Sequence, residues 1–443
     1  MEPSHNIRAA IVTMGCAKNE VDSANMAERL LDAGIDVVED PASADAIIVN
    51  TCSFIQSATE ESLDTIFEML GLENVERGGA KVIVAGCMPA RYGDELAESL
   101  EEVNTFVPCS KEDDIAAIVG SLFNAEGPGG LRSGGYGLPA GTTGQGLLAG
   151  SGVSVYVKIS DGCDRFCSYC TIPFIRGRFH SFPYEDIRAE VARQVEAGAR
   201  EVVLIAQDTG RWGQDLAEGH DLAWLLAKLA EEFCDTWFRV MYLQPEGITD
   251  ALVECIEGHA NIASYLDIPL QHVDEDMLRS MNRRGSYGEF VELVHSLRER
   301  VPDITLRTTL IAGFPGETQA QFELMCDFLE EAEFDYVGVF PYSREEGTRA
   351  AKLPAQLDEE VKLERAQTVR DVADAISEAR IRERIGANLD VLVLGAEEDG
   401  QVFGRALCQA PEVDGVVYLD RGNPGDIVNV TIVDTLMYEM EGE

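Results

Sequence analysis

The chain has 443 residues, which is enough for two or three domains that each bury a core of their own. Hydrophobic residues make up 45% and charged residues 26%, as in soluble globular proteins, and no apolar run is long enough to span a membrane. The formal net charge of −44 disfavours nucleic acid as a partner and favours a basic one, although a generally acidic proteome would give the same bias.

Cysteine usage indicates metal or redox chemistry. The chain contains 11 cysteines, an odd number, and residues 1–6 have neither the basic region nor the apolar core of a signal peptide. Disulfides are rare in long chains without such a signal, where thiols more often bind metals. We therefore expect a cytoplasmic protein without a membrane segment.

Residues 1–126 are predicted to form a doubly wound α/β domain. Strand-like runs alternate with helix-like stretches, the runs at 9–14, 46–50 and 82–85 and the stretches at 23–33 and 58–70. Each of these strands ends at a cysteine, namely Cys16, Cys52 and Cys87. Packing is the commoner role of a single buried cysteine. Because the carboxyl ends of such strands share one edge, however, three together predict a three-thiolate site.

A second α/β region is predicted at 153–378, after a glycine-rich linker at 127–152 that contains eleven glycines. Its predicted strands are 153–160, 201–207, 238–243, 265–270, 305–312 and 336–341, and helices fit at 184–197, 222–233, 250–257 and 319–332. Six such units predict a partial (βα) barrel with its active site at the carboxyl ends of the strands.

Three further cysteines, Cys163, Cys167 and Cys170, lie on one short loop after the first strand of this barrel. Thiolates are the usual ligands of a cubane 4Fe–4S cluster, and three ligands for four irons leave one iron open. The spacing C-x3-C-x2-C is similar to that of radical S-adenosylmethionine (SAM) enzymes, in which the open iron binds SAM. The alternative is a zinc site, which requires a fourth ligand such as His180 and more often uses paired C-x-x-C units.

Other polar groups are predicted at the carboxyl ends of the same strands, at 207–209, 271–272 and 313–318. The turn through Gly313 and Gly316 opens a helix, so its backbone N–H groups are candidates for cofactor binding. The alternative is an ordinary tight turn. The sequence assigns no role to Gln271 and His272.

Residues 379–443 are predicted to form the C-terminal domain, a small all-β barrel. It begins at the end of a charged helix predicted at 358–385. The strand-like runs are 390–394, 402–406, 416–419 and 427–433. From residue 386 onward the chain has two arginines, Arg405 and Arg421, no lysine and twelve carboxylate side chains. A nucleic-acid-binding barrel needs a basic face, and this composition cannot supply one.

With these parts assembled, the chain resembles the methylthiotransferases, a branch of the radical SAM enzymes, over essentially its whole length. The resemblance lies in the motifs 15–19, 21–23, 49–55, 85–92, 162–170 and 172–177, and the C-terminal barrel is similar to the family's TRAM domain. It implies that Cys16, Cys52 and Cys87 hold an auxiliary 4Fe–4S cluster. It also implies that the cysteines of the loop at 163–170 hold the cluster that binds SAM, and no catalytic residue is expected beyond these ligands.

Within that family the chain is more similar to the branch that modifies a ribosomal protein (RimO type). The similarity rests on the segments 206–209, 245–250, 265–272 and 342–348. The chain departs from the usual pattern at Ala17 and at Phe182. It also departs at Asn104 and at Pro108-Cys109, which replace a familiar Asp and Gly. None of these departures removes a cluster ligand, so they bear on substrate contacts.

The resemblance implies insertion of a methylthio group at the β-carbon of an aspartate in small-subunit ribosomal protein twelve. That C–H bond resists polar chemistry, so the cofactors supply a carbon radical while the protein orients and shields them. A cellular reductant and a sulfur donor are implied partners. Tyr169 is a candidate contact to the adenine of SAM, or else a shield for the cluster.

The acidic C-terminal barrel is predicted to dock the substrate, because ribosomal proteins are basic, and no direct tRNA binding is expected. Two alternatives remain, a tRNA adenosine methylthiotransferase and a non-catalytic iron–sulfur carrier or scaffold. The other five cysteines are predicted to be buried small hydrophobic residues: Cys109, Cys234, Cys255, Cys326 and Cys408.

Overall fold

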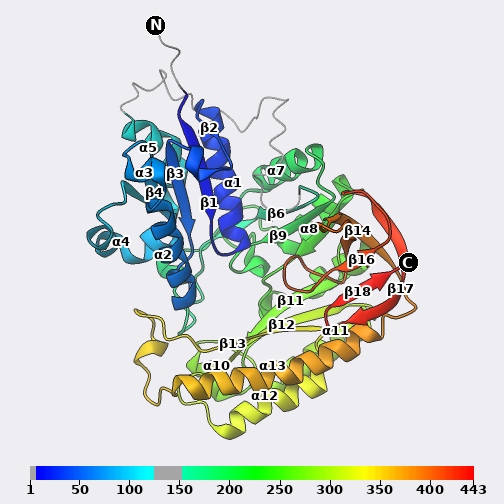
Figure 1. Cartoon of the computed structure of the whole chain (residues 1–443). Coiled ribbons are helices and arrows are strands. Elements are labelled where there is room, and N and C mark those ends of the chain that lie inside the picture. Colours follow the sequence, from blue (N-terminus) through cyan, green and yellow to red (C-terminus); the bar gives the residue numbers. More distant parts are fainter. Residues whose placement is uncertain (1–5, 124–151) are drawn as a thin grey trace. The chain divides into compact units, whose positions relative to one another are not determined.

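The computed structural model describes residues 6–123 and 152–443, and these divide into two compact units (Figure 1). Unit 1 contains residues 6–123 together with the segment 170–178. Unit 2 contains residues 152–169 and 179–443. The predicted linker at 127–152 lies outside the described residues except for Gly152.

Unit 1 is a five-stranded parallel sheet in the order β2-β1-β3-β4-β5. The strands are β1 (Arg8–Thr13), β2 (Asp36–Val37), β3 (Ala46–Thr51), β4 (Lys81–Gly86) and β5 (Thr105–Pro108). The apolar β3 is buried along its whole length, as expected of a strand covered on both faces.

Helices cover both faces of this sheet, which confirms the predicted doubly wound domain. The helices are α1 (Ala17–Asp32), α2 (Gln56–Leu70), α3 (Glu73–Glu76), α4 (Cys87–Ser99), α5 (Ile115–Leu122) and α6 (Ile172–Ile175). Residues of α2 and α4 share one core with the sheet, and residues of α1 and α5 share the core on the other face.

The larger part of unit 2 is the predicted partial barrel. One parallel sheet has the order β10-β9-β6 and contains β6 (Ser154–Lys158), β9 (Glu201–Ile205) and β10 (Trp237–Val240). The other has the order β11-β12-β13 and contains β11 (Tyr265–Gln271), β12 (Thr305–Ala312) and β13 (Tyr336–Pro341). A parallel bridge from Phe238 to Ile262 and a hydrogen bond from Leu243 N–H to Asp267 O link the two sheets.

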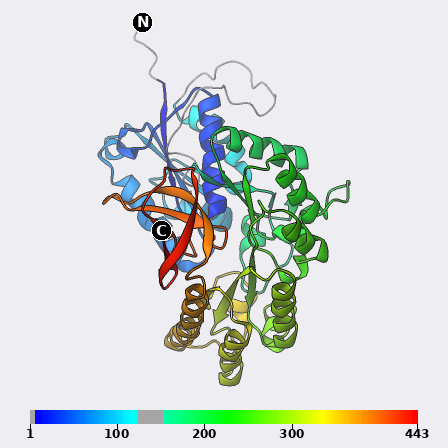
Figure 2. The same cartoon turned by 90° about the vertical axis from the view of Figure 1, so that its right-hand side faces the viewer.

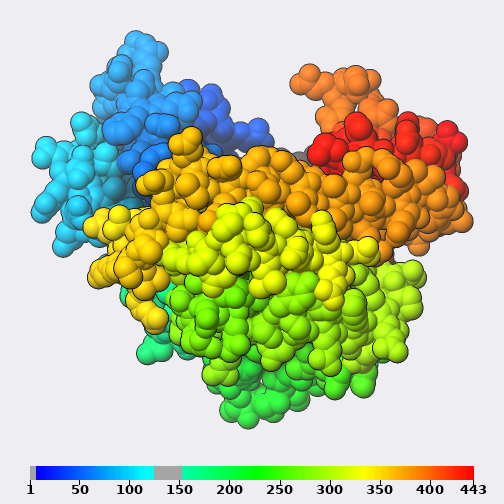
Figure 3. Space-filling model, turned by 90° about the horizontal axis from the view of Figure 1, so that it is seen from below, coloured from blue at the N-terminus to red at the C-terminus, as the bar shows by residue number. Residues whose placement is uncertain are grey.

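The helices of the partial barrel are α7 (Tyr184–Glu196), α8 (Leu222–Glu232), α9 (Asp250–Gly258), α10 (Glu275–Ser280), α11 (Tyr287–Arg300), α12 (Gln319–Ala332) and α13 (Glu359–Arg382). A small hairpin pairs β7 (Ser160–Asp161) with β8 (His180–Ser181). Figure 3 shows α13, in orange, beside α12, in yellow, on the outer face of this unit. None of the helices in the described ranges is long and apolar enough to cross a membrane.

The rest of unit 2 is a closed barrel in the order β14-β15-β16-β18-β17, as predicted (orange to red in Figure 2). Its strands are β14 (Asn388–Ala396), β15 (Val402–Ala406), β16 (Val417–Leu419), β17 (Ile427–Leu436) and β18 (Glu439–Gly442).

A buried polar layer joins this C-terminal barrel to the amino ends of the central strands. Arg405 donates to Glu201, the first residue of β9, at 2.5 Å, and to the hydroxyl of Ser154, the first residue of β6, at 2.8 Å. Tyr265, the first residue of β11, donates to Asp414 at 2.5 Å. The C-terminal barrel therefore packs at the amino ends of these strands and leaves their carboxyl ends for the cysteine loop.

Candidate functional site

The cysteine loop of unit 2 follows β6 and β7 at the carboxyl end of the first barrel strand, as predicted. Cys163 is buried and Cys167 is half-buried. Burial raises the pKa of the Cys163 thiol. Arg283 points Nη1 at Cys167 Sγ, 3.9 Å away, and donates from Nη2 to the carbonyl of Pro269 at 2.5 Å. Arg283 therefore joins the sulfur of Cys167 to the backbone of β11.

A distant segment of the chain, 280–283, holds this loop in place. Asn282 donates from its side-chain amide to the carbonyls of Arg165 and Phe166, at 3.0 and 3.1 Å. Ser168 donates its N–H to Met281 O at 2.9 Å. Asn282 and Phe166 both have a left-handed backbone, with φ of 59° and 50°. Asparagine tolerates this conformation, and an Asn just beyond the C-cap of a helix is the sequence signal that could have identified the anchor.

The predicted strand-end group 207–209 meets the loop through Asp208. Asp208 is fully buried and ion-paired with Arg165, which also lies 3.1 Å from Glu246. Burial raises the pKa of Asp208, although Arg165 opposes the effect. In the same group, both amide atoms of Gln207 are buried and meet no hydrogen-bond partner within the described ranges. Such an unpaired amide is suited to a ligand contact.

The turn through Gly313 and Gly316 is held from within the chain. Gly313 N–H donates to the carboxylate of Glu317 at 3.0 Å, and Gly316 N–H donates to Ala355 O at 2.9 Å. Glu317 also accepts from Arg365 at 2.7 Å and lies 3.4 Å from Nε2 of His272. The backbone N–H groups proposed for cofactor binding thus already have partners, and His272 belongs to the network that fixes the turn.

Tyr169 lies against the same turn. It packs on a small apolar cluster that includes Phe314 of the turn, Met281 of the loop anchor and Tyr342. Phe314 and Tyr342 meet edge to face at 5.3 Å. Two of the predicted cofactor-binding elements, Tyr169 and the glycine turn, therefore belong to one apolar cluster in unit 2. The third cysteine of the loop, Cys170, is half-buried and belongs to the segment that packs with unit 1.

In unit 1, the cysteines Cys16, Cys52 and Cys87 follow the neighbouring strands β1, β3 and β4 at their carboxyl ends, as predicted. We call this set the edge site and the set Cys163, Cys167 and Cys170 the loop site. Cys16 is exposed, whereas Cys52 and Cys87 are buried. Burial raises the pKa of Cys52 to about 11, and the neighbouring Cys87 and Cys16 act in the same direction. Cys87 and Cys16 are therefore near enough to Cys52 to influence the ionisation of that thiol.

Glycines allow this close approach. Gly15 has φ of +98°, and a Cβ added to it would lie 2.5 Å from Cys52 Cβ and 3.0 Å from Cys52 Sγ. Ser62 fixes the other side of Cys52, because its hydroxyl accepts from Cys52 N–H at 3.1 Å and donates to Cys52 O at 2.8 Å. The backbone before α1 and the side chain of Cys52 are thus packed against each other.

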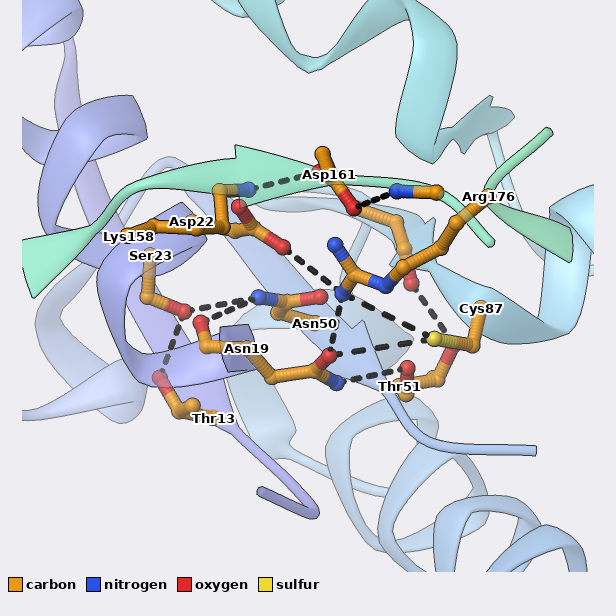
Figure 4. Close-up of polar contacts among 12 residues, drawn as sticks. Thr13, Asn19, Asp22, Ser23, Asn50, Thr51, Cys87, Lys158, Asp161 and Arg176 are labelled. Carbon is orange, nitrogen blue, oxygen red and sulfur yellow. Dashed lines mark hydrogen bonds and ion pairs between the residues drawn. The ribbon is translucent and has the colours of Figure 1, made fainter. Parts of the chain in front are cut away.

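A polar network fixes the edge site (Figure 4). Asn19 donates to the carbonyls of Met14 and Thr51, at 2.9 and 3.0 Å, and so ties together the ends of β1 and β3. Arg176 donates to Asn19 and to Asp22, both at 2.8 Å, and its Nη2 lies 3.9 Å from Cys87 Sγ. Sequence reasoning gave these residues no role, although Asn19, Asp22 and Arg176 lie in the motifs that carry the family resemblance.

Cys109 corrects the prediction that the remaining cysteines only fill the core. It follows β5, is half-buried and lies close enough to Cys87 to influence the ionisation of that thiol. Cys109, with help from Arg176, lowers the pKa of Cys87 to about 7 despite its burial, while the pKa of Cys109 is raised. Cys234 is exposed, so the prediction of burial was wrong there, whereas Cys255 and Cys408 are buried.

The donor sets of both sites suit iron–sulfur clusters. Each supplies three thiols, at least one of them buried, and an arginine beside one sulfur. Within residues 6–123 and 152–443, no three His, Cys, Asp or Glu side chains are gathered closely enough to hold a single metal ion. His180, the candidate fourth zinc ligand, is exposed on β8 with its ring against Phe182.

Three family models match successive parts of the chain. They are an uncharacterized protein family, UPF0004, at residues 8–108, the radical SAM superfamily at 157–329 and the TRAM domain at 385–443. The ribosomal protein uS12 methylthiotransferase RimO of Geobacter sulfurreducens is 41% identical, with 98% of each chain covered. The protein of that name from Natranaerobius thermophilus is 41% identical, with 99% of each chain covered.

The chain belongs to the RimO family. Solved structures that are much less identical in sequence to this chain share its fold. The radical SAM methyltransferase TsrM from Kitasatospora setae matches 76% of this chain and 77% of its own, with a TM-score of 0.56 and 15% identity. The cobalamin-dependent radical SAM enzyme OxsB matches 84% of this chain and 56% of its own, with a TM-score of 0.52 and 11% identity.

Proposed function

We propose that this protein is a radical SAM methylthiotransferase that adds a methylthio group to the β-carbon of an aspartate in ribosomal protein uS12. The observation that carries the proposal is full-length membership of the RimO family together with two separate three-cysteine sets, each at the carboxyl ends of parallel strands. When bound, a 4Fe–4S cluster and SAM supply the radical that removes hydrogen from the aspartate, and an auxiliary cluster supplies the place for sulfur.

At the loop site, the chain's own residues hold and shield the cofactors. Asn282 and Ser168 fix the loop, and Arg283 contacts the sulfur of Cys167. Gln207 has a buried amide at the end of β9 that meets no partner among the described residues, and we assign it a contact with SAM or with the substrate carboxylate. Tyr169 is half-buried and packs on the apolar cluster behind the turn at Gly313 and Gly316, and we assign its ring a contact with the adenine of SAM.

At the edge site, the chain provides three thiols and a neighbouring positive charge. Arg176 is almost fully buried and ion-paired with Asp22, so its position relative to Cys87 is fixed. A fixed cation beside the ligand sulfur offsets the cost of burying a negatively charged cluster. These features support an auxiliary cluster at the edge site. An enzyme with such a cluster can transfer sulfur to its substrate, whereas one without it could only cleave SAM.

The surface of the C-terminal barrel supports a basic protein as the substrate. Arg405 is buried against Glu201, so Arg421 is the basic side chain that this barrel exposes, and it is paired with Asp420. Of the twelve carboxylates, Asp414 is buried and Glu439 is half-buried, and the others are exposed. This surface would attract a basic ribosomal protein and repel tRNA. A ribosomal substrate also implies that the enzyme acts in the cytoplasm, with a cellular reductant and a sulfur donor.

Docking and chemistry would then take place at opposite ends of the central strands, because the C-terminal barrel packs at their amino ends. A substrate that uses both must extend along unit 2. A short peptide that carries only the target loop would lack the docking contact. Whole uS12 is therefore expected to have a lower KM than the peptide, and this advantage should shrink as salt is raised.

The experiment compares three substrates with the reconstituted enzyme, SAM, sulfide and dithionite: whole uS12, the loop peptide and tRNA. A mass increase of one methylthio group on uS12 and its peptide, with tRNA unchanged, supports the proposal. Modified tRNA with unmodified uS12 would replace it by the tRNA branch, and absence of SAM cleavage would leave an iron–sulfur carrier.

A further inference from the structure

Two segments of unit 2 hold the cysteine loop from either side of Ser168. Ser168 donates its N–H to Met281 O at 2.9 Å, and its carbonyl accepts from Ala350 N–H at 2.8 Å. Met281 follows α10, and Ala350 lies in the stretch that follows β13. The segments 280–284 and 343–352 therefore both lie against the loop, at the carboxyl ends of the barrel strands.

Both segments carry exposed cations. Arg284 on the first segment, and Arg349 and Lys352 on the second, are exposed, and their side chains form no hydrogen bond or ion pair with any residue in 6–123 or 152–443. Arg344 is exposed as well, and its Nε donates to Ala351 O at 3.0 Å. We call Arg284, Arg344, Arg349 and Lys352 the basic patch.

A local excess of positive charge stands out in a chain whose formal net charge is −44. Exposed cations elsewhere are often paired with a carboxylate, as Lys228 is with Glu231. Within 343–352, Glu346 is the one exposed carboxylate, because Glu345 is buried. The basic patch is therefore positive at the rim of the loop site, whereas the chain as a whole is strongly negative.

We propose that the basic patch is the docking surface for the electron carrier that reduces the loop site, and that this carrier is a small acidic protein with a one-electron centre. The inference rests on the proposed function, which requires a reduced cluster at the loop site. The reduced carrier gives up one electron and the cluster gains it. No bond is formed or broken in this step, and no proton moves.

The position of the patch suits this role, because electron transfer slows steeply with distance. Arg284 directly follows Arg283, whose Nη1 lies 3.9 Å from Cys167 Sγ. Arg349 directly precedes Ala350, which donates to the backbone of the cysteine loop. A carrier that contacts the patch is thus one residue away from groups that touch the loop.

The charges select the kind of partner. An acidic carrier is repelled by most of this chain and attracted by the patch, so the field of the protein steers it to the loop site. A basic ribosomal protein is repelled by the same cations and attracted by the acidic C-terminal barrel, so the two partners use different surfaces.

A nucleic acid fits the patch less well than a compact acidic protein does. Nucleic acids bind through many phosphate contacts along an extended basic surface. Four cations on a chain of net charge −44 offer few such contacts, and the remaining length of the nucleic acid would meet carboxylates.

The test measures binding of a flavodoxin, an acidic protein whose flavin gives up one electron, to the fully reconstituted enzyme by calorimetry. The patch variant replaces three of its cations by glutamine: Arg284→Gln, Arg349→Gln and Lys352→Gln. Arg344 is kept because it bonds to the backbone. The control variant removes the same charge from three exposed arginines elsewhere: Arg77→Gln, Arg200→Gln and Arg382→Gln.

The patch variant is expected to bind the flavodoxin about tenfold more weakly than wild type at low salt, because three exposed charge pairs are lost. The control variant should stay within about twofold, and all differences should shrink as salt is raised. Equal affinities, or equal losses in both variants, would overturn the proposal. An RNA hairpin that binds wild type but not the patch variant, with flavodoxin binding unchanged, would assign the patch to nucleic acid.

Reduction is measured with the loop cluster alone, in a background of alanine at Cys16, Cys52 and Cys87. Oxidation of the flavin by one electron, followed by absorbance, should be about tenfold slower in the patch variant than in the control variant at low salt. Excess dithionite should reduce the cluster to the same extent in both. Equal rates with the flavodoxin would refute a role in reduction.

The outcomes separate this inference from the proposed function. If the patch governs flavodoxin binding but uS12 gains no methylthio group with dithionite, the proposed function fails and the docking surface stands. If uS12 is modified with dithionite but the patch variant binds flavodoxin as wild type does, the docking surface fails and the proposed function stands.

Discussion

The loop site and the edge site use the same number of thiols but are built in different ways. The loop site takes its cysteines from one stretch of eight residues, and its shape depends on the anchor at 280–283. The edge site takes one cysteine from the end of each of three strands, so its shape depends on the register of β1, β3 and β4. A local site can thus fail through loss of its anchor, and a non-local site through a shift of the sheet.

Removing each set of thiols separates the two sites most strongly. Alanine at Cys163, Cys167 and Cys170 is expected to abolish SAM cleavage, with 5′-deoxyadenosine falling to background. Alanine at Cys16, Cys52 and Cys87 should leave SAM cleavage and abolish the methylthio product, because the radical chemistry belongs to the loop site. Chromatography of the nucleoside and mass measurement of uS12 give both results. Methylthio product from the second variant would contradict the division of roles.

A substitution at Glu201, remote from both sites, is expected to have the largest effect on the free energy of unfolding. Burial alone would raise the pKa of Glu201, but Arg405 and Arg239 outweigh it and lower the pKa to about 2. Glu201→Gln is expected to destabilise unit 2 by about 3–5 kcal/mol, because it leaves Arg405 buried without its partner. Denaturant unfolding measures the loss, and Glu231→Gln, at an exposed pair with Lys228, is the matched control.

The same pair predicts a pH dependence. Because the folded pKa of Glu201 is below the ordinary value of 4.5, its contribution is complete above pH 4.5 and is lost as pH falls from 4.5 towards 2. The stability difference between wild type and Glu201→Gln should therefore shrink in that window, by up to about 1.4 kcal/mol per pH unit. A difference that stays constant from pH 7 to pH 3 would show that Glu201 does not carry this charge.

Loss of the loop anchor should affect the loop site alone. Arg283→Met removes the donors to Cys167 and to the carbonyl of Pro269, at an expected cost of about 1.5–3 kcal/mol. Loop-site iron, measured in an edge-site alanine background, should be lost faster to a chelator. Arg279→Met, at an exposed arginine on α10, is the control. Equal rates for the two variants would mean that Arg283 does not support the loop.

The smallest expected effect is at Gly15. Gly15→Ala places a methyl group against Cys52, whereas Gly34→Ala, at a similar positive φ, meets nothing within 4 Å. Both variants bear the backbone strain, so their difference, about 1–3 kcal/mol, reports the crowding at the edge site. Edge-site iron, measured in a loop-site alanine background, should fall in Gly15→Ala only. The same loss in Gly34→Ala would assign the effect to backbone strain.

Much of the fold follows from local patterns in the sequence. The buried apolar runs predicted the six barrel strands, and β12 and β13 have the predicted bounds. The short edge strands β2 and β5 were missed because a strand of two to four residues has no clear period. The helices α10 and α11 were missed as well. The loop cysteines were visible as a spacing, and the edge cysteines as three residues that each end a strand.

The contacts that complete both sites join residues far apart in the chain, and sequence spacing does not encode them. Asn282 reaches the loop from more than a hundred positions away, and Arg176 reaches Asn19 from farther still. Cys109 resembled a packing residue, because only the pairing of β4 with β5 brings it near enough to Cys87 to lower the pKa of that thiol. Such roles depend on sheet register and on the packing of distant segments.

The measurement that tests the central claim most directly is an iron count on three anaerobically reconstituted proteins. Wild type is expected to hold about eight irons, four for each cubane, and each triple-alanine variant about four. Two half-loaded variants with distinct spectra would establish two independent sites. If the variant at Cys16, Cys52 and Cys87 keeps the wild-type iron, the edge site holds no cluster, and the account of two sites is wrong.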